Sequence, residues 1–291
     1  MTKKTISLLL ALCMIFALAA CSSSNKGQGS GTEEDPWICG NTADDDVRVY
    51  IVESSLIVDG DGEMKNYDDP ADRPWHKQIG DISDISIFGA LKYIGKNAFN
   101  GAGANLGDEY VYLFLSDGIE AIGESAFEDV KFSFDSDDFH FSEIITIPES
   151  VVRIDASAFA NSHPDEIYIN GAPEVIESAF EGNTSTVYVR NGSGFECLPY
   201  GGELTYKTLY AFNYEDDYGT DEITGAGTEY IPEGETATYD ANSYISDESY
   251  VFDHYEVVSG DIQIADPANP ELSFVITGDV SIKIVYVKAA E

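Results

Sequence analysis

One pattern of aliphatic and small residues recurs between Ile85 and Val189. Each copy contains an Ile-x-Ile strand or a close variant, then spaced apolar residues, and ends in Ala-Phe. Because side chains alternate between the two faces of a strand, the paired aliphatic residues are expected to point into a core. Four full copies and the start of a fifth span 85–99, 113–127, 145–159, 167–180 and 187–189.

The spacing within a copy is more regular than the spacing between copies. From the second strand aliphatic to the Phe, the interval is 12 residues in three copies (99−87, 127−115, 159−147) and 11 in the fourth (180−169). A constant half-turn joined by variable return segments is typical of a solenoid with parallel strands and a buried column of Phe rings. The alternative, Ala-Phe pairs in unrelated helices, does not explain the constant interval.

The outward positions of the repeat strands form a candidate ligand-binding surface. Alternation places there a row of aromatic and β-branched residues, which can either stabilise the sheet through neighbour contacts or recognise a ligand. Both interpretations remain open from the sequence. The candidate binding residues are Tyr112, Phe114, Thr146, Tyr168 and Tyr188.

The third copy carries a family resemblance. Residues 147–159, IPESVVRIDASAF, resemble the leucine-rich repeat of the BspA type, roughly I-P-x-x-V-x-x-I-G-x-x-A-F. Gly95 and Gly123 match the Gly of that pattern, whereas Asp155 departs from it and the fourth copy is one residue short. The resemblance implies a leucine-rich-repeat solenoid over 81–202 and a role in binding or adhesion.

A second segment predicts a cap for the first repeat. Residues 46–52 and 55–58 alternate as a β-hairpin, and residues 56–67 with Pro74-Trp75 resemble the segment that precedes BspA-type repeats. A solenoid needs its first coil covered, so we expect Met64, Tyr67 and Trp75 to pack on it from an N-terminal cap at 35–80. The acidic stretch from Asp59 to Glu63 favours a turn over a calcium loop, because a full ligand set is missing.

Residues 203–291 differ in character from the repeats. We predict a small all-β domain, which resembles a divergent internalin B-repeat with Tyr255 in place of a Trp. Such modules serve as spacers or ligand binders. The acidic runs at 44–46 and 215–217 are expected to be solvated loops. The predicted strands are 209–214, 236–239, 252–258, 272–276 and 280–287.

The N-terminus carries a targeting pattern. Lys3 and Lys4 precede an apolar run at 6–18 that is too short to span a bilayer, as in a signal peptide over 1–20. Residues 18–21, LAAC, resemble a bacterial lipoprotein box, which implies diacylation of Cys21 and an outward-facing protein on a flexible tether at 21–34. The alternative is an ordinary secretory signal.

The net charge limits the classes of molecule that the chain can bind. Without the signal the chain keeps 13 Lys+Arg (15−2) against 53 Asp+Glu, a net charge of −40, which argues against nucleic acid. Cys39 and Cys197 lie on either side of the repeats, too far apart for a disulfide, so both thiols are expected to be free. An inserted β-hairpin at 132–141 is predicted either to thicken the core or to form a binding finger.

The sequence therefore predicts a mainly β protein: a leucine-rich-repeat solenoid with an N-terminal hairpin cap and a small β domain. No catalytic constellation is apparent, and we expect neither an enzyme nor a cofactor or metal. The expected function is that of a monomeric, lipid-anchored surface protein that binds a host or matrix protein. The alternatives are polysaccharide capture for nutrition and a passive stalk.

Overall fold

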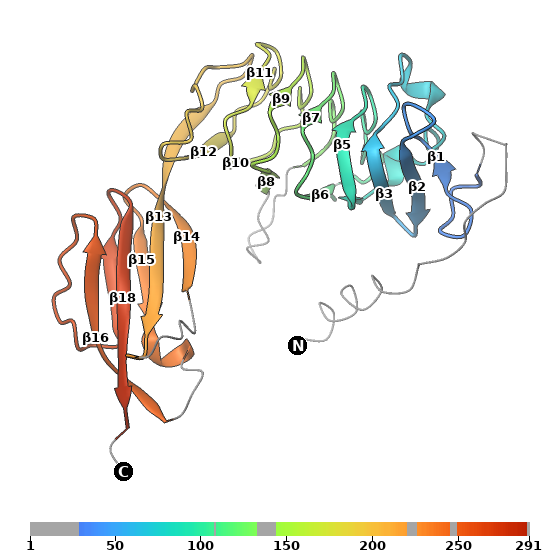
Figure 1. The fold of residues 1–291 in the computed structure, drawn as a ribbon. Helices are drawn as coiled ribbons and strands as arrows, with labels where there is room; N and C mark the ends of the chain where they lie inside the picture. The colour runs from blue at the N-terminus through green and yellow to red at the C-terminus, as the bar shows by residue number, and fades with distance from the viewer. Residues whose placement is uncertain (1–28, 108, 133–143, 220–225, 245–248, 290–291) are drawn as a thin grey trace.

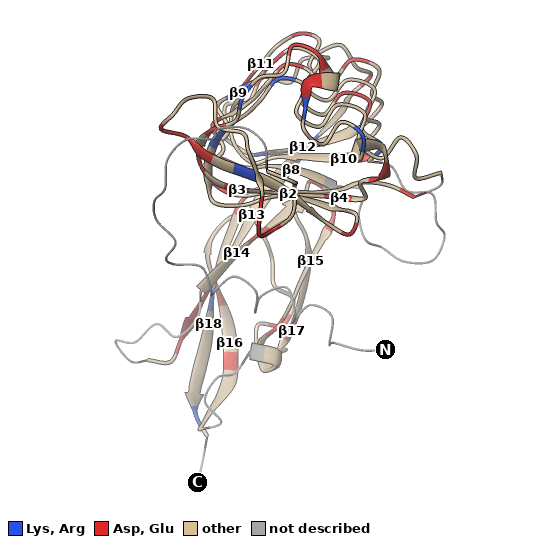
Figure 2. Cartoon of the chain, turned by 90° about the vertical axis from the view of Figure 1, so that its right-hand side faces the viewer, with Lys and Arg blue, Asp and Glu red and all other residues tan. Residues whose placement is uncertain are grey.

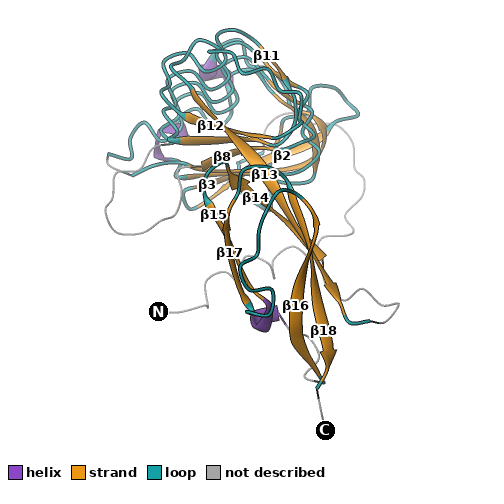
Figure 3. Cartoon of the chain, turned by 90° about the vertical axis from the view of Figure 1, so that its left-hand side faces the viewer, coloured by secondary structure: helices purple, strands orange, loops and turns teal. Residues whose placement is uncertain are grey.

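The computed structural model describes residues 29–107, 109–132, 144–219, 226–244 and 249–289. It is mainly β, with parallel sheets and only short 3-10 helices (Figures 1 and 3). Cys21, the signal segment and most of the predicted hairpin at 132–141 lie outside the described residues. Within the described ranges, no helix is both long and apolar enough to cross a membrane.

Each of the four full copies contributes a strand to each of two rows of parallel strands, here called ladders, and the fifth contributes one to the first ladder only. The first ladder consists of β4 (Asp84–Ile87), β6 (Tyr112–Leu115), β8 (Ile144–Ile147), β10 (Glu166–Ile169) and β12 (Thr186–Arg190). The second consists of β5 (Ala90–Ile94), β7 (Ala121–Ile122), β9 (Arg153–Ile154) and β11 (Glu174–Val175). Successive copies lie side by side in Figure 1, and their apolar residues share one core.

The register between copies follows the sequence repeat. Ile85 pairs with Leu113, and Ile167 pairs with both Ile145 and Val187, in parallel strands. In the second ladder Val175 takes the position of Ile154, whereas matching the isoleucines of the third and fourth copies by sequence predicts Ile176 there. The distance from the second-strand residue to the Phe is then five positions in every copy (99−94, 127−122, 159−154, 180−175). The residue missing from the fourth copy is therefore lost before the second strand.

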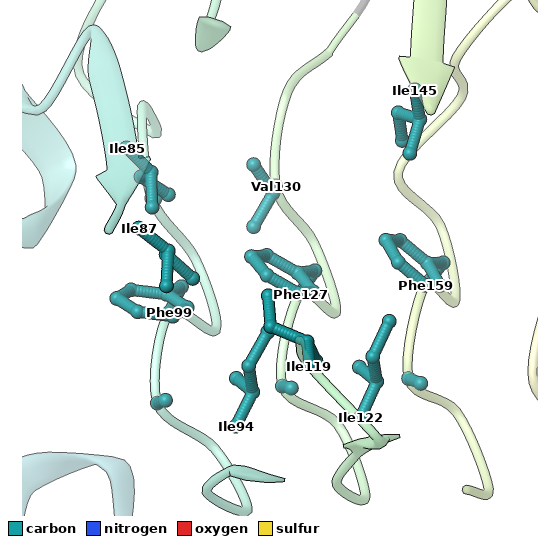
Figure 4. Packing of buried hydrophobic residues seen from close by; sticks show 14 of the residues in the cluster. Ile85, Ile87, Ile94, Phe99, Ile119, Ile122, Phe127, Val130, Ile145 and Phe159 are labelled. Carbon is teal, nitrogen blue, oxygen red and sulfur yellow. The ribbon is translucent and has the colours of Figure 1, made fainter. Parts of the chain in front are cut away.

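The Phe residues form the predicted column. Ring centroids are 5.2 Å apart for Phe99 and Phe127, 5.1 Å for Phe127 and Phe159, and 5.5 Å for Phe159 and Phe180, all stacked. Figure 4 shows the first three of these rings in successive coils, with the strand aliphatics around them. All four Phe side chains are fully buried, so each ring packs against the rings of the adjacent copies.

A backbone ladder accompanies the Phe column. The N–H of each Phe donates to a carbonyl of the next coil: Phe99 to Ala126, Phe127 to Ala158, Phe159 to Ala179 and Phe180 to Tyr200, at 2.8–3.0 Å. The close approach of neighbouring turns explains Gly123. A Cβ at this position would lie 2.7 Å from the carbonyl oxygen of Ile94, nearer than real side chains come.

The N-terminal cap continues both ladders. It is built from β1 (Trp37–Ile38), β2 (Asp46–Val52), β3 (Ser55–Glu63) and the 3-10 turns η1 (Pro70–Asp72) and η2 (Ile79–Asp81). One half of β3 pairs with β4 and the other half with β5. The turn predicted at Asp59–Glu63 is wrong, because this acidic stretch is the second half of strand β3 and not a loop.

The cap residues expected on the first repeat are buried there. Met64, Tyr67 and Trp75 are at most 3% exposed, and the Trp75 ring stacks on Phe99 at 6.4 Å. The first coil has no preceding coil whose N–H groups could bind its loop carbonyls. Arg73 and Trp75 replace them. The Nη1 of Arg73 donates to the carbonyls of Asn97 (2.8 Å), Ala98 (3.3 Å) and Asn100 (2.9 Å), and the Nε1 of Trp75 donates to that of Ala98 at 2.9 Å. The cap therefore extends both the aromatic column and the polar ladder.

The C-terminal part is joined to the repeats by one long strand, β13 (Thr205–Asp217). Its first residues pair with β12 in parallel, and its second half pairs with β14 and β18 around a second hydrophobic cluster. The five strands predicted here are confirmed with shifted ends, and the strand at 226–232 was missed. The other elements are β14 (Ala226–Pro232), β15 (Thr236–Asp240), η3 (Ala241–Tyr244), β16 (Tyr250–Ser259), β17 (Glu271–Val275) and β18 (Val280–Lys288).

Two smaller predictions can be checked on the same structure. The solvated loop expected at 215–217 is wrong, because these residues end strand β13 and Asp216 is buried. The free-thiol prediction is confirmed, since Cys39 and Cys197 are both unpaired, the first buried and the second exposed. Burial raises the pKa of the Cys39 thiol to about 11, so this thiol stays protonated at neutral pH.

Candidate interaction face

The candidate residues share the outer face of the first ladder. Tyr112 pairs with Asp84 and Phe114 with Ser86 between β4 and β6. Thr146, Tyr168 and Tyr188 pair in turn across β8, β10 and β12. The structure thus brings the five predicted residues onto the same side of the repeats, in two sheets, and it separates them into an exposed part and a covered part.

The part near the cap exposes aromatic rings. Tyr112 is 61% exposed and Phe114 is 41% exposed. The Phe88 ring, at the end of β4, lies 5.4 Å from the Phe114 ring, and the hydroxyl of Ser86 donates to Asp84 at 2.8 Å. Burial raises the pKa of the Asp84 carboxyl above its usual value. We call Phe88, Tyr112, Phe114, Asp84 and Ser86 the aromatic face.

The other end of the row is covered. Tyr188 is only 4% exposed, so its predicted place on an open binding surface is wrong. The ring lies between Tyr168, stacked at 4.5 Å, and the ammonium of Lys207 in β13, 5.4 Å from its centroid. Both hydroxyls donate to Glu166, at 3.4 Å from Tyr168 and 3.0 Å from Tyr188. Burial, followed by the charge of Glu166, raises the pKa of Tyr168 to about 12.

Contacts with the C-terminal strands hold this end closed. The guanidinium of Arg190 lies 4.0 Å from the Tyr230 ring centroid of β14 and 3.4 Å from a carboxylate oxygen of Glu149. Asn191 donates to Asp279 at 3.0 Å, and the same carboxylate accepts the Ala211 N–H at 2.8 Å. The last repeat strand is therefore fixed to the second sheet, and this part of the row acts as a junction.

The two parts of the face meet at an irregular point. Within the described ranges, no strand pairing joins β6 to β8, although β7 and β9 of the same copies are paired. Pro148 contributes to this break. Ser116 and Asn170 occupy the same position in other copies and donate their N–H to the preceding coil, whereas proline has no N–H. Leu113 and Leu115 are accordingly only partly buried, unlike their fully buried equivalents Ile85 and Ile87.

The charged side chains on the outer face of β4, β6, β8 and β10 are acidic. The outward positions of β3, β4, β6, β8 and β10 include no Lys or Arg. Asp84 and Glu166 are acidic, and so is Asp59, which follows the half of β3 paired with β4 and is itself paired with Arg48 of β2. Asp61 and Glu63 lie on the half of β3 that pairs with β5, outside this face. Figure 2 shows the same excess of Asp and Glu over Lys and Arg across the repeats. The exposed rings therefore lie in a negatively charged setting.

Other polar groups do not assemble into a comparable site. Asp216 is buried in the second core with one carboxylate oxygen unpaired, and burial raises its pKa. His254 is exposed between Asp253 and Glu256, whose hydrogen bonds raise its pKa. In the described part of the chain, no group of three or more His, Cys, Asp or Glu could hold a metal ion.

Two members of the aromatic face were missed by the sequence reasoning. In the first copy, alternation across the Ile85-x-Ile87 pair alone gives one outward residue, Ser86. Extending the same alternation by one step in each direction gives Asp84 and Phe88. The covering of Tyr188 had no local signal, because it depends on the strand that follows the last repeat.

Comparisons with known proteins give little similarity. No family model matches the chain, and no curated protein matches it. A solved structure with some similarity is a leucine-rich repeat protein from Eubacterium ventriosum ATCC 27560, at 20% sequence identity and a TM-score of 0.34. The match covers 51% of this chain and 44% of that protein, so the chain spans less than half of its length. A TM-score of this size does not establish a common fold.

Proposed function

We propose that the chain is a binding protein whose repeat region is a rigid scaffold and whose recognition surface is the aromatic face. The observation that carries this proposal is the exposure of Tyr112 and Phe114, with Phe88 beside them, on a regular sheet. Among the described residues of the repeat region, most of the other aromatic rings are buried. Aromatic residues are favoured at the centres of protein interfaces, and a flat sheet presents them at little conformational cost.

The proposal extends to repeat class and location. Residues 81–202 would form a leucine-rich-repeat solenoid of the BspA type, and the chain would act in adhesion to a host or matrix protein at the bacterial surface. The in-register copies, the Phe column and the capped first coil support this repeat class. The surface location rests on the LAAC segment at 18–21 alone.

Polysaccharide capture is the second candidate function. Phe88 and Phe114 offer rings on which a sugar can stack, and the carboxylate of Asp84, held by the buried Ser86 hydroxyl, offers a hydrogen-bond acceptor next to them. A passive stalk gains some support from Tyr188, which is covered by its own chain. That covering stops short of Tyr112 and Phe114, so we prefer a binding function.

The decisive experiment compares the soluble mature protein with a Tyr112→Ser/Phe114→Ser variant on a matrix-protein panel and a glycan array. We expect the variant to bind its ligand at least about tenfold more weakly, because interface aromatics are frequent hot spots. A Val152→Ser/Ile176→Ser variant is the matched control, since these residues are 63% and 38% exposed away from this face. Ligand binding that survives in the face variant would refute the proposal.

Membrane anchoring is tested separately. We expect the mature wild-type protein to carry two acyl chains on Cys21 and to stay with the cell envelope, because two chains hold a protein at a bilayer where one does not. Cys21→Ser should remove the acyl mass and release the protein into the medium. The measurement is the intact mass together with the partition into detergent, and an unacylated wild-type protein would contradict the anchor.

A further inference from the structure

The cations of this chain are few, and several of them lie over aromatic rings. Lys207 lies 5.4 Å from the Tyr188 centroid, Lys131 lies 4.7 Å from the Tyr110 centroid, and the Arg190 guanidinium lies 4.0 Å from that of Tyr230. Such pairs are stabilised by the attraction of a positive charge to the face of the ring. The aromatic surface of this protein is thus suited to cationic side chains.

The row of outward residues has a cation over an aromatic ring at one end and exposed rings at the other. At its covered end, Lys207 of the next strand is paired with Tyr188 and lies over its ring. At the open end, the residue paired with Phe114 on β4 is Ser86, and Thr146 holds the equivalent position on β8. Neither of these residues carries a positive charge, and no Lys or Arg in the described part of the chain lies over Tyr112 or Phe114 as Lys207 lies over Tyr188.

The charge around the open end is negative. Asp84 is paired with Tyr112, and Asp59 follows the half of β3 that pairs with β4, where it is itself paired with Arg48 of β2. A whole-chain charge of −38 raises the local concentration of cationic ligands and speeds their association. A partner with the same sign of charge would be repelled from this face.

From this placement we infer that the aromatic face binds an extended polypeptide segment of a partner protein that carries Arg or Lys. A cationic side chain would lie over Tyr112 or Phe114 with Asp84 as its counter-charge, as Lys207 does over Tyr188. This inference rests on the proposed binding function and names the chemistry of the partner. A neutral glycan as the ligand would contradict it.

The test uses the soluble mature protein and two synthetic peptides, acetyl-(Ser-Arg)5-amide and the uncharged acetyl-(Ser-Gln)5-amide. Affinity is measured by fluorescence anisotropy in 150 mM NaCl, where long-range attraction is largely screened. We expect the Arg peptide to bind and the Gln peptide not to bind. The Tyr112→Ser/Phe114→Ser variant should bind the Arg peptide about fivefold more weakly, which matches the loss of an exposed cation–π contact.

Controls separate this site from general attraction to an acidic protein. Asp84→Asn is expected to lower the affinity for the Arg peptide about threefold. Glu174→Gln, which removes an exposed charge from β11, should change this affinity less than about twofold. Val152→Ser/Ile176→Ser should leave the affinity unchanged. Equal losses in the face and control variants would overturn the inference, as would equal binding of the two peptides.

The outcome also distinguishes this inference from the proposed function. If the Arg peptide does not bind but the face variant still loses its matrix or glycan ligand, the cationic partner is wrong and the binding surface stands. If the face variant loses neither peptide nor ligand, both are wrong.

Discussion

Replacing Arg73 with Met is expected to lower the free energy of unfolding of the repeat region by about 2–4 kcal/mol, because two carbonyls lose their donor at about 1–3 kcal/mol each. These are the carbonyls of Asn97 and Asn100, whereas the Ala98 carbonyl keeps the N–H of Trp75. Arg73 is 4% exposed and donates to three carbonyls of the first coil and, through Nε, to Pro70 at 2.7 Å. Burial lowers its pKa to about 10, which leaves the guanidinium charged at neutral pH. Met keeps the apolar stem and removes every donor.

The measurement is urea unfolding followed by tryptophan fluorescence. Trp37 and Trp75, the two tryptophans of the chain, both lie in the repeat-region core, so their signal reports this unit and not the C-terminal one. Arg153→Met is the matched control, since Arg153 is about half exposed and pairs with Asp155 at the surface. Its expected cost is below about 1 kcal/mol. Equal costs for the two variants would show that Arg73 does not hold the first coil.

Periodicity predicted the parts of this fold that depend on local contacts. The paired aliphatics of each copy alternate, so Ile85 and Ile87 could be assigned to the core without knowing which strand would lie next to them. The Phe column followed from a constant interval, since repeated units with the same half-turn place the same side chain at the same height. Tyr67 and Trp75 could be assigned to the cap because the first coil must be covered.

Interactions between residues far apart in the sequence could not be predicted from periodicity. The donors of Arg73 are used by carbonyls 24–27 positions away, and nothing around Arg73 in the sequence marks it as buried. Tyr188 was placed on an open surface because its own strand has the right alternation, but β13 brings Lys207 over it. The assignment of Val175 in place of Ile176 required the register of β9 and β11. These are tertiary effects that override a local pattern.

Phe127→Ala is expected to lower the free energy of unfolding by about 3–5 kcal/mol, the usual cost of truncating a buried Phe. Its ring is fully buried and stacks on Phe99 at 5.2 Å and on Phe159 at 5.1 Å, so truncation opens a cavity in the middle of the column. Phe114→Ala is the control in the same copy, because this ring is 41% exposed and should cost less than about 1 kcal/mol. Urea unfolding monitored by tryptophan fluorescence measures both.

A double-mutant cycle tests whether the rings act as a column. Phe127 and Phe159 are in direct contact, so the double Ala variant should be non-additive by more than about 0.5 kcal/mol. Phe99 and Phe159 are separated by Phe127, and their cycle should close to within about 0.5 kcal/mol. If the separated pair were coupled as strongly as the adjacent pair, stability would not pass from coil to coil through nearest neighbours. The same scaffold would then be expected to loosen as a whole when any one coil is damaged, and the aromatic face on β4 and β6 would lose its shape with it.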